Sequence, residues 1–313
     1  MIVRATASHV EVWAPAKLNL FLEIRGKRSD GYHEIETLMV PVALYDTLLI
    51  SPTEPADSKA DIQLTIDSGE FRSACNEENL PSAENTVVQA IKALRSQLRG
   101  QGTTNQGALA RDSQGIRVRL IKRIPVAAGL AGGSSDAAAA LRGAAALWDA
   151  QVDDAELSAA AARVGSDVPF FLPGGAAICR GRGEETSPCA LPRMHFVIVK
   201  PPDGLSTAKV YQACAASAPQ FAVESLVEAL RQGDWRRIRK ALFNGLEHAA
   251  EQLCPAISEL RAAFEQQNVI AHQMSGSGTS YFGICASARS ARSVAARLRA
   301  RNLGRVFAVS SCA

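Results

Sequence analysis

Hydrophobic and polar residues alternate along three segments in the first half of the chain, and this period of two predicts β-strands. The segments are 61–67, 116–120 and 17–24, the last with leucine or isoleucine at every second position. Because successive side chains of a strand point to opposite faces, we expect Lys17 and Asn19 to lie together on the face away from these leucines.

Apolar residues that recur every three or four positions predict helices elsewhere in this half. One helix follows Asn85 and extends to about residue 98. A second begins at 134–136, where two serines and an aspartate can cap free backbone N–H groups. A third starts with Asp153 and Glu156 in capping-box spacing and ends at Gly165.

The pattern restarts with an apolar strand at 195–199, so we place a domain boundary before it and expect domains 1–190 and 191–313. The elements expected after this strand are helices at 223–232, 234–243 and 255–267, a pair of strands flanking 275–279, a helix at 288–301 and a strand at 305–309. The segment 97–115 is rich in glycine, glutamine and threonine, which predicts an exposed loop without an assigned role.

Length and composition fit a globular protein of two domains. The chain has 313 residues, of which 47% are hydrophobic and 21% charged, values that exclude a disordered or collagen-like chain. No apolar run approaches the ~18 to 20 residues that span a bilayer, so no membrane segment is expected. The first residues lack the pattern of a secretory signal, which predicts a cytoplasmic protein.

Cysteine usage and charge exclude several kinds of site. Seven widely spaced cysteines without a Cys-x-x-Cys pair argue against a disulfide framework and a structural zinc site, so we expect reduced cysteines that fill the core. The five histidines have no metal-ligand spacing, and a catalytic zinc is unsupported. The net charge is only +3, and the basic segments 231–240 and 289–305 have the helical spacing of solvated faces.

The strongest chemical signal is a glycine-rich segment at 125–136, between a predicted strand and a predicted helix. Three glycines allow close backbone approach, and the helix N-terminus adds partial positive charge, so the segment suits an anion such as phosphate. It matches neither the Walker loop nor the dinucleotide pattern, and the alternative is a turn that permits close helix packing. Its candidate binding residues are Pro125, Ala128, Gly129, Leu130, Ala131, Gly132, Gly133, Ser134 and Ser135.

A second glycine-serine segment, 274–280, is a weaker signal, because a β-hairpin built from small residues has the same composition. As an anion-binding nest on the second domain it would be consistent with a ligand held at the domain interface. Its candidate binding residues are Gly276 and Ser277.

Four single side chains have both an ordinary and a functional interpretation. Lys17, among apolar neighbours, is either a surface lysine with a packed stem or a functional cation. Asp167, before Val-Pro-Phe-Phe, either caps a turn or is a carboxylate suited to general-base work. Tyr32 and His33 are either ordinary surface residues or an aromatic pair on which a base can stack.

Taken together, these segments resemble the GHMP small-molecule kinases, in order and spacing, from about residue 11 to 309. The motifs that carry the resemblance are Pro-Ala-Lys-Leu-Asn-Leu at 15–20, Asp-Gly-Tyr-His at 30–33, Gly-Leu-Ala-Gly-Gly-Ser-Ser-Asp-Ala-Ala at 129–138, Gly-Ser-Asp-Val-Pro-Phe-Phe at 165–171 and Met-Ser-Gly-Ser-Gly at 274–278. The first two motifs narrow the resemblance to the branch that acts on a cytidine diphosphate-linked methylerythritol.

The resemblance implies an α+β fold with a ribosomal-S5-domain-2-like N-terminal domain, a ferredoxin-like C-terminal domain and an active site in the cleft between them. It implies transfer of the γ-phosphoryl of ATP, accompanied by Mg²⁺, to the 2-hydroxyl of the methylerythritol unit, in the non-mevalonate route to isoprenoid precursors. Asp167 would accept the hydroxyl proton, and Lys17 would offset developing charge, as phosphoryl transfer requires. The implied partner is this small molecule alone, with no nucleic acid and no membrane, and the protein a monomer or weak homodimer.

The resemblance also assigns the binding residues. Asn19 would orient the methylerythritol end, Tyr32 would stack on the cytosine, and His33 would hydrogen-bond its edge. Tyr211 would form a second aromatic wall.

On the nucleotide side, the segment 129–135 would cradle the ATP phosphates, with Asn85 and Lys122 beside the adenine. Ala127 and Ala131 stand where many family members have glycine, which predicts a stiffer loop whose methyl groups face away from the phosphates.

Two other functions stay open on the sequence. A sibling GHMP kinase acting on homoserine or a mevalonate derivative would share the glycine-serine loops but lack the Tyr-His pair. A non-catalytic module that binds RNA through its basic segments would lose affinity steeply with added salt.

Overall fold

The computed structural model describes residues 1–6, 8–53, 62–68, 85–100, 107, 111, 115–214 and 222–312. The chain forms two compact units, each assembled from several stretches. Unit 1 consists of Met1–Ala16, Leu44–Ile124 and Ala131–Gly174, and unit 2 of Lys17–Ala43, Pro125–Leu130 and Gly175–Ala313. Of the loop predicted at 97–115, residues 97–100 are helical, so the prediction is wrong there, and most of the remainder lies outside the described residues.

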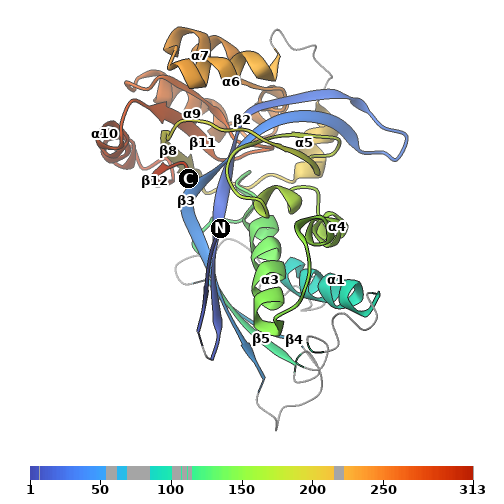
Figure 1. Ribbon diagram of the computed structural model, residues 1–313. Helices are drawn as coiled ribbons and strands as arrows, with labels where there is room; N and C mark the ends of the chain where they lie inside the picture. Colours follow the sequence, from blue (N-terminus) through green and yellow to red (C-terminus); the bar gives the residue numbers. More distant parts are fainter. Residues whose placement is uncertain are drawn as a thin grey trace. The chain divides into compact units, whose positions relative to one another are not determined.

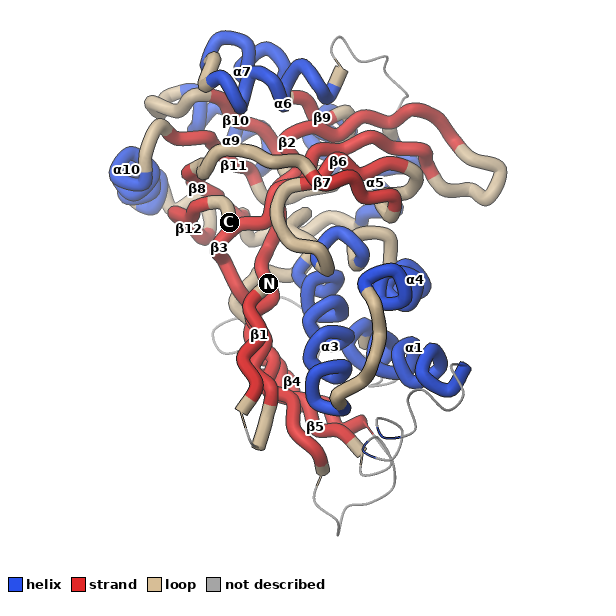
Figure 2. The backbone as a smooth tube through the Cα atoms, viewed as in Figure 1, coloured by secondary structure: helices blue, strands red, loops and turns tan. Residues whose placement is uncertain are grey.

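Unit 1 contains short strands at the ends of two long ones (Figure 2). β1 (Ile2–Ala5) pairs antiparallel with the first residues of β2 (Val10–Lys27). The end of β3 (His33–Pro52) pairs antiparallel with β5 (Ile116–Ile121), and β4 (Ile62–Asp67) is parallel to β5. The strands predicted at 61–67 and 116–120 are thus confirmed for their described residues, whereas β1 and β3 were not predicted.

Three helices of unit 1 pack against one another (Figure 1). They are α1 (Thr86–Gly100), α3 (Gly132–Trp148) and α4 (Asp154–Val164). The apolar stripe predicted for α1 is buried. The capping box predicted for α4 is confirmed, with Asp153 Oδ1 accepting from Glu156 N at 2.8 Å and Asp153 N donating to Glu156 Oε2 at 2.9 Å.

The start of α3 differs from the prediction. The helix begins at Gly132, after Ala131 at φ 53°, and no side chain caps it. The chain therefore turns into the helix through a left-handed residue, and the expectation that 134–136 provide the cap is wrong. The Asp136 carboxylate bonds the Lys122 ammonium instead.

Unit 2 contains a four-stranded antiparallel sheet in the order β10 (Ala271–Met274), β11 (Tyr281–Cys285), β8 (His195–Lys200) and β12 (Arg305–Ser310). Helices α9 (Ala256–Glu265) and α10 (Ala288–Arg299) pack against it, and α6 (Val223–Gln232) and α7 (Trp235–Ala241) pack together. These elements confirm the predictions for the second half, with small differences at helix ends.

Several elements of unit 2 were not predicted. They are α5 (Thr207–Ala213), α8 (Glu247–Leu253), the two-residue β9 (Phe243–Asn244), β6 (Ala177–Arg180) and β7 (Glu185–Pro188). β9 pairs with β2 at Phe21, and β6 pairs with β3 at Thr37. The short helix η6 (Pro169–Phe171) in unit 1 was also missed.

Two expectations from composition concern the whole chain. No helix of the described residues is long and apolar enough to cross a membrane. The six described cysteines are free, and four of them are buried, as expected for reduced core residues.

Candidate functional site

Three segments of unit 2, far apart in the sequence, meet around the amine of Lys17. This side chain, in β2, is only 4% exposed. Its Nζ donates to Asn19 Oδ1 at 2.5 Å and to the carbonyl oxygen of Gly129 at 3.1 Å. A Cβ placed on Gly276 would lie 3.2 Å from both Lys17 Nζ and Asn19 Oδ1. Lys17 is therefore a buried cation and not a surface lysine.

The orientation of Asn19 is set by β3. Asn19 and Lys17 share a face of β2, as the alternation predicted, and Asn19 Nδ2 donates to Thr37 Oγ1 at 2.8 Å. Thr37, which is fully buried, donates in turn to the carbonyl of Phe21 at 2.6 Å. Because the amide nitrogen is bound in this way, the amide oxygen faces the ammonium. Thr37 was not found from the sequence, since β3 itself was not predicted.

The second glycine-serine segment joins β10 to β11, which pair as an antiparallel hairpin. Ser275 Oγ donates to the carbonyl of Gly129 at 3.1 Å and accepts from Asn19 N at 3.3 Å. Asn244 Nδ2 bonds the carbonyls of Met274 and Gly276, each at 2.9 Å. The hairpin interpretation is thus correct for the flanking strands, and the segment also contacts the first half of the glycine-rich loop.

Gly129 lies at the point of closest approach between these two loops. Its φ is +72°, and a Cβ there would lie 2.0 Å from the carbonyl oxygen of Ser275. Both the backbone angle and the contact require glycine. Ala127 has φ 49°, so it occupies the left-handed region at a cost of about 1–2 kcal/mol. The stiffer loop expected from alanine at that position stays a prediction.

The rest of the glycine-rich segment belongs to unit 1, at the start of α3. Thr86 Oγ1 donates to the carbonyl of Gly133 at 3.0 Å, and Asn85 Oδ1 accepts from Val87 N at 2.9 Å, so Asn85 caps the first turn of α1. Ser134 is half-buried. Ser135 is fully buried, and its hydroxyl has no hydrogen-bond partner among the described residues.

Lys122 forms a buried cluster with Asp46 and Asp136 in unit 1. Its Nζ lies 2.7 Å from an oxygen of each carboxylate, and the three side chains are at most 6% exposed. Asp46 also accepts from the backbone N–H groups of Arg123 and, at 2.8 Å, Ile124. The two aspartates were missed as partners, because nothing local in the sequence links them to Lys122.

The cluster holds two carboxyl groups and one amine, and their proximity shifts the pKa values of Asp136 and Lys122. Burial raises the pKa of the Asp136 carboxyl, and the Asp46 carboxylate raises it further, against the lowering effect of Lys122. Burial alone would lower the pKa of Lys122, but the two carboxylates outweigh it and the pKa is raised. The ammonium points to the carboxylates, and the adenine-side role of Lys122 stays a prediction.

The residues expected at the cytidine end lie in unit 2. Tyr32, in the turn between β2 and β3, is 55% exposed, and the guanidinium carbon of Arg182 is 4.8 Å from its ring centre. His33 and Tyr211, from α5, lie with ring centres 5.1 Å apart and ring planes at 31°. Ser277 Oγ is 2.9 Å from Thr207 Oγ1, also on α5. Arg182 was missed, since its approach to Tyr32 joins segments 150 residues apart.

Asp167 lies in unit 1, between α4 and the short helix η6. It is half-buried, next to the fully buried Val168 and the buried pair Phe170 and Phe171. Asp167 therefore adjoins buried apolar residues along the chain, and its role as a base stays a prediction. Among the described residues, no group of three or more His, Cys, Asp or Glu side chains could hold a metal ion.

Comparison with known proteins places these features in a family. Sequence models of the GHMP kinases N terminal domain and the GHMP kinases C terminal match residues 85–175 and 226–303. The 4-diphosphocytidyl-2-C-methyl-D-erythritol kinase of Pelotomaculum thermopropionicum is 39% identical to this chain, over 91% of this chain and 92% of the relative. The enzyme of the same name from Heliobacterium modesticaldum is 37% identical, over 91% of this chain and 89% of the relative.

A solved structure agrees. A crystal structure of a 4-(cytidine 5'-diphospho)-2C-methyl-D-erythritol kinase is 36% identical, with a TM-score of 0.76 over 97% of this chain and 99% of that one. The two family-model matches lie on either side of residue 190, and the boundary predicted there stays a proposal. The chain belongs to the GHMP kinases, within the family of 4-diphosphocytidyl-2-C-methyl-D-erythritol kinases, and is an ATP-dependent small-molecule kinase.

Proposed function

We propose that this kinase transfers the γ-phosphoryl group of ATP to the 2-hydroxyl of 4-diphosphocytidyl-2-C-methyl-D-erythritol, a step in the synthesis of isoprenoid precursors. The names of the relatives support this substrate. The observation that carries the proposal is the buried Lys17 ammonium, bonded to Asn19 and to the Gly129 carbonyl of the glycine-rich loop.

Lys17 provides positive charge for the reaction. Phosphoryl transfer depends on positioning and charge stabilisation more than on covalent help from the protein. A cation held away from bulk water interacts more strongly with a nearby anion than an exposed one does. Lys17 therefore stabilises negative charge on the transferred phosphoryl group, and Asn19 orients the acceptor end of the substrate.

Asp167 acts as the general base. The 2-hydroxyl oxygen attacks the γ-phosphorus, its proton passes to the Asp167 carboxylate, and ADP leaves. Its place in the Gly-Ser-Asp-Val-Pro-Phe-Phe motif at 165–171, beside buried apolar residues, supports this role.

ATP binds through the glycine-rich segment and the first turn of α3, whose backbone N–H groups favour phosphate. The buried Ser135 hydroxyl, without a partner among the described residues, fits a site that takes phosphate and its Mg²⁺. Mg²⁺ arrives with ATP and supplies charge neutralisation of the phosphates. The residues assigned to ATP are Asn85, Lys122, Pro125 and 128–135, and those assigned to the cytidylated substrate are Asn19, Tyr32, His33, Tyr211, Gly276 and Ser277.

The test is an ADP-release assay with the cytidylated substrate, for the wild type and Asp167→Asn. The variant should fold normally by circular dichroism and lose about 10² or more in kcat, the scale of a lost general base. Asp154→Asn, an exposed aspartate in α4 whose side chain is 78% accessible, is the matched control and should keep full activity.

Two outcomes would contradict the proposal in different ways. An Asp167→Asn enzyme within a few-fold of wild type would show that Asp167 is not the base. A wild-type enzyme that phosphorylates homoserine or mevalonate, but not the cytidylated substrate, would assign it to a sibling activity.

A further inference from the structure

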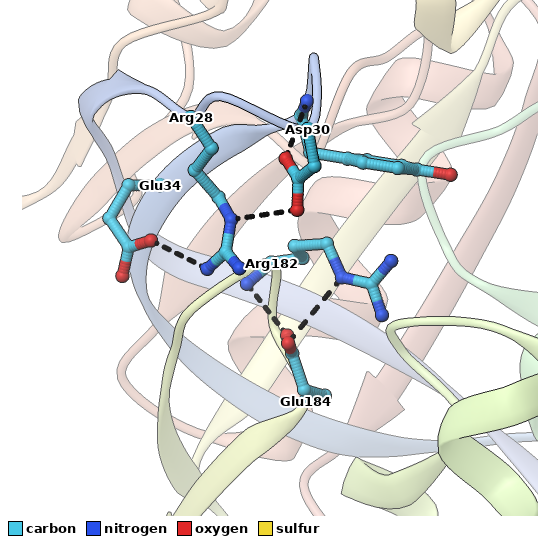
Figure 3. Close-up of polar contacts among 6 residues, drawn as sticks. Arg28, Asp30, Glu34, Arg182 and Glu184 are labelled. Atoms are coloured by element: carbon cyan, nitrogen blue, oxygen red, sulfur yellow. Dashed lines mark hydrogen bonds and ion pairs between the residues drawn. The ribbon is translucent and has the colours of Figure 1, made fainter.

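Arg182 lies in the turn between β6 and β7 and is held by its neighbour Glu184. Its backbone N–H donates to Glu184 Oε2 at 2.6 Å, and its Nε donates to Glu184 Oε1 at 3.4 Å (Figure 3). The side chain is 29% exposed, and its guanidinium carbon lies over the Tyr32 ring, 4.8 Å from the ring centre. The guanidinium is thus held by Glu184 through Nε and by its contact with the Tyr32 ring.

The turn that presents Tyr32 is itself braced by charged groups. Arg28 bonds Asp30 at 3.1 Å and Glu34 at 3.0 Å, and Asp30 Oδ1 accepts from Tyr32 N at 3.1 Å (Figure 3). Burial is the largest single influence and raises the pKa of the Asp30 carboxyl, but the Tyr32 N–H, the hydrogen bond from Arg28 and the charges of Arg28 and Arg182 together outweigh it, and the pKa is lowered. The carboxylate therefore stays ionised and keeps the Tyr32 backbone in place at neutral pH.

Arg28 and Arg182 differ in the N–H donors that they leave available to a ligand. Arg28 uses both Nε and Nη1 on carboxylates, whereas the terminal nitrogens of Arg182 have no hydrogen-bond partner among the described residues. In Figure 3 the dashed lines reach the backbone nitrogen and Nε of Arg182, and none reaches its terminal nitrogens. A guanidinium edge with two parallel N–H donors matches a phosphate group in bidentate geometry.

We propose that Arg182 is a specificity-determining residue, whose Nη1–Nη2 edge binds the diphosphate of a nucleoside-diphosphate-linked substrate with its base stacked at Tyr32. The inference rests on the proposed function, because it needs Tyr32 as the base platform. A base alone is uncharged and gains little from this edge, but the diphosphate attached to its ribose is anionic.

The surrounding charges limit this recognition to a ligand that is already docked. Asp30, Glu34 and Glu184 together outnumber Arg28 and Arg182, so the cluster does not attract free anions. We therefore expect pyrophosphate alone to bind no better than chloride at this turn. Arg182 therefore selects a ligand that carries the base and the diphosphate in one molecule.

The experiment compares cytidine, CMP and CDP as competitive inhibitors of the full-length enzyme. Arg182→Gln should weaken CDP about tenfold, CMP less, and cytidine less than twofold, the scale of one lost charge-assisted hydrogen-bond pair. Arg182→Lys should recover part of the CDP affinity. In turnover, Arg182→Gln should raise KM for the cytidylated substrate and leave kcat and KM for ATP unchanged.

Arg292→Gln is the matched control, since it removes the same charge from an exposed position in α10 of the same unit. Equal losses for cytidine and CDP in Arg182→Gln would overturn the proposal, because they would show that Arg182 only supports the Tyr32 ring. Unchanged CDP inhibition would overturn it too, while leaving the proposed function intact. If neither cytidine nor CDP inhibits the wild type, the cytidine end of the proposed function fails together with this inference.

Discussion

Replacing Lys122 by methionine would leave the carboxylates of Asp46 and Asp136 buried without a cation. Both lie 2.7 Å from the Lys122 ammonium, and their side chains are 0% and 3% exposed. Removing one partner from a buried ion pair typically lowers the free energy of unfolding by about 3–5 kcal/mol. We expect a loss of this size at pH 9.5, with methionine filling the volume of the lysine stem.

The loss should depend on pH, because the Asp136 carboxyl has a raised pKa in the folded protein. Between its unfolded value, about 3.9, and the higher folded value, the folded state binds more protons than the unfolded chain. Stability therefore falls as pH rises through this window. Without Lys122 the folded pKa rises further, so the variant and the wild type differ in the titration of Asp136 only above the wild-type value of about 8, and the loss should be larger at pH 9.5 than at pH 7.

The assay is urea unfolding at pH 7 and pH 9.5, followed by circular dichroism. The double variant Lys122→Met/Asp136→Asn should recover at least half of the loss at pH 9.5, since one buried charge is then removed. Lys92→Met, an exposed lysine on α1, is the control. A loss below about 1 kcal/mol at pH 9.5, or an equal loss at both pH values, would show that the two carboxylates do not depend on Lys122 for their charge balance.

Two further substitutions test the loops and the cytidine end. Tyr32→Ala should raise KM for the cytidylated substrate at least fivefold, given about 1–3 kcal/mol for stacking of one base, and should leave KM for ATP near normal. Equal losses for both substrates would show that the two ends are misassigned. Gly129→Ala should lower stability by about 2 kcal/mol or more and reduce kcat/KM, because a Cβ would lie 2.0 Å from the Ser275 carbonyl at φ +72°. A thermal transition and activity equal to wild type would contradict that requirement for glycine.

The sequence predicts the parts of this protein that local periodicity determines. The apolar stripe of α1, the capping box of α4 and the bounds of α6 follow from spacing, and so does the pairing of Lys17 with Asn19 on one face of β2. β3 was missed because its central residues are buried on both faces, which removes the alternation that marks a strand.

The site residues that were missed act through contacts between distant segments. Thr37 orients Asn19 across two strands, and Asp136 pairs with Lys122 instead of capping its own helix. A short-range capping rule could not anticipate a buried cation as the stronger partner. Arg182 likewise gains its position only when the β6–β7 turn meets Tyr32.

The carbonyl oxygen of Gly129 accepts hydrogen bonds from two side chains, Lys17 Nζ and Ser275 Oγ. Because this acceptor is a peptide oxygen, no amino-acid replacement at position 129 can delete it. Sequence divergence among relatives can alter only the two donors that converge on it. Any ligand that shifts this one peptide plane would thus disturb the amine and the hydroxyl simultaneously.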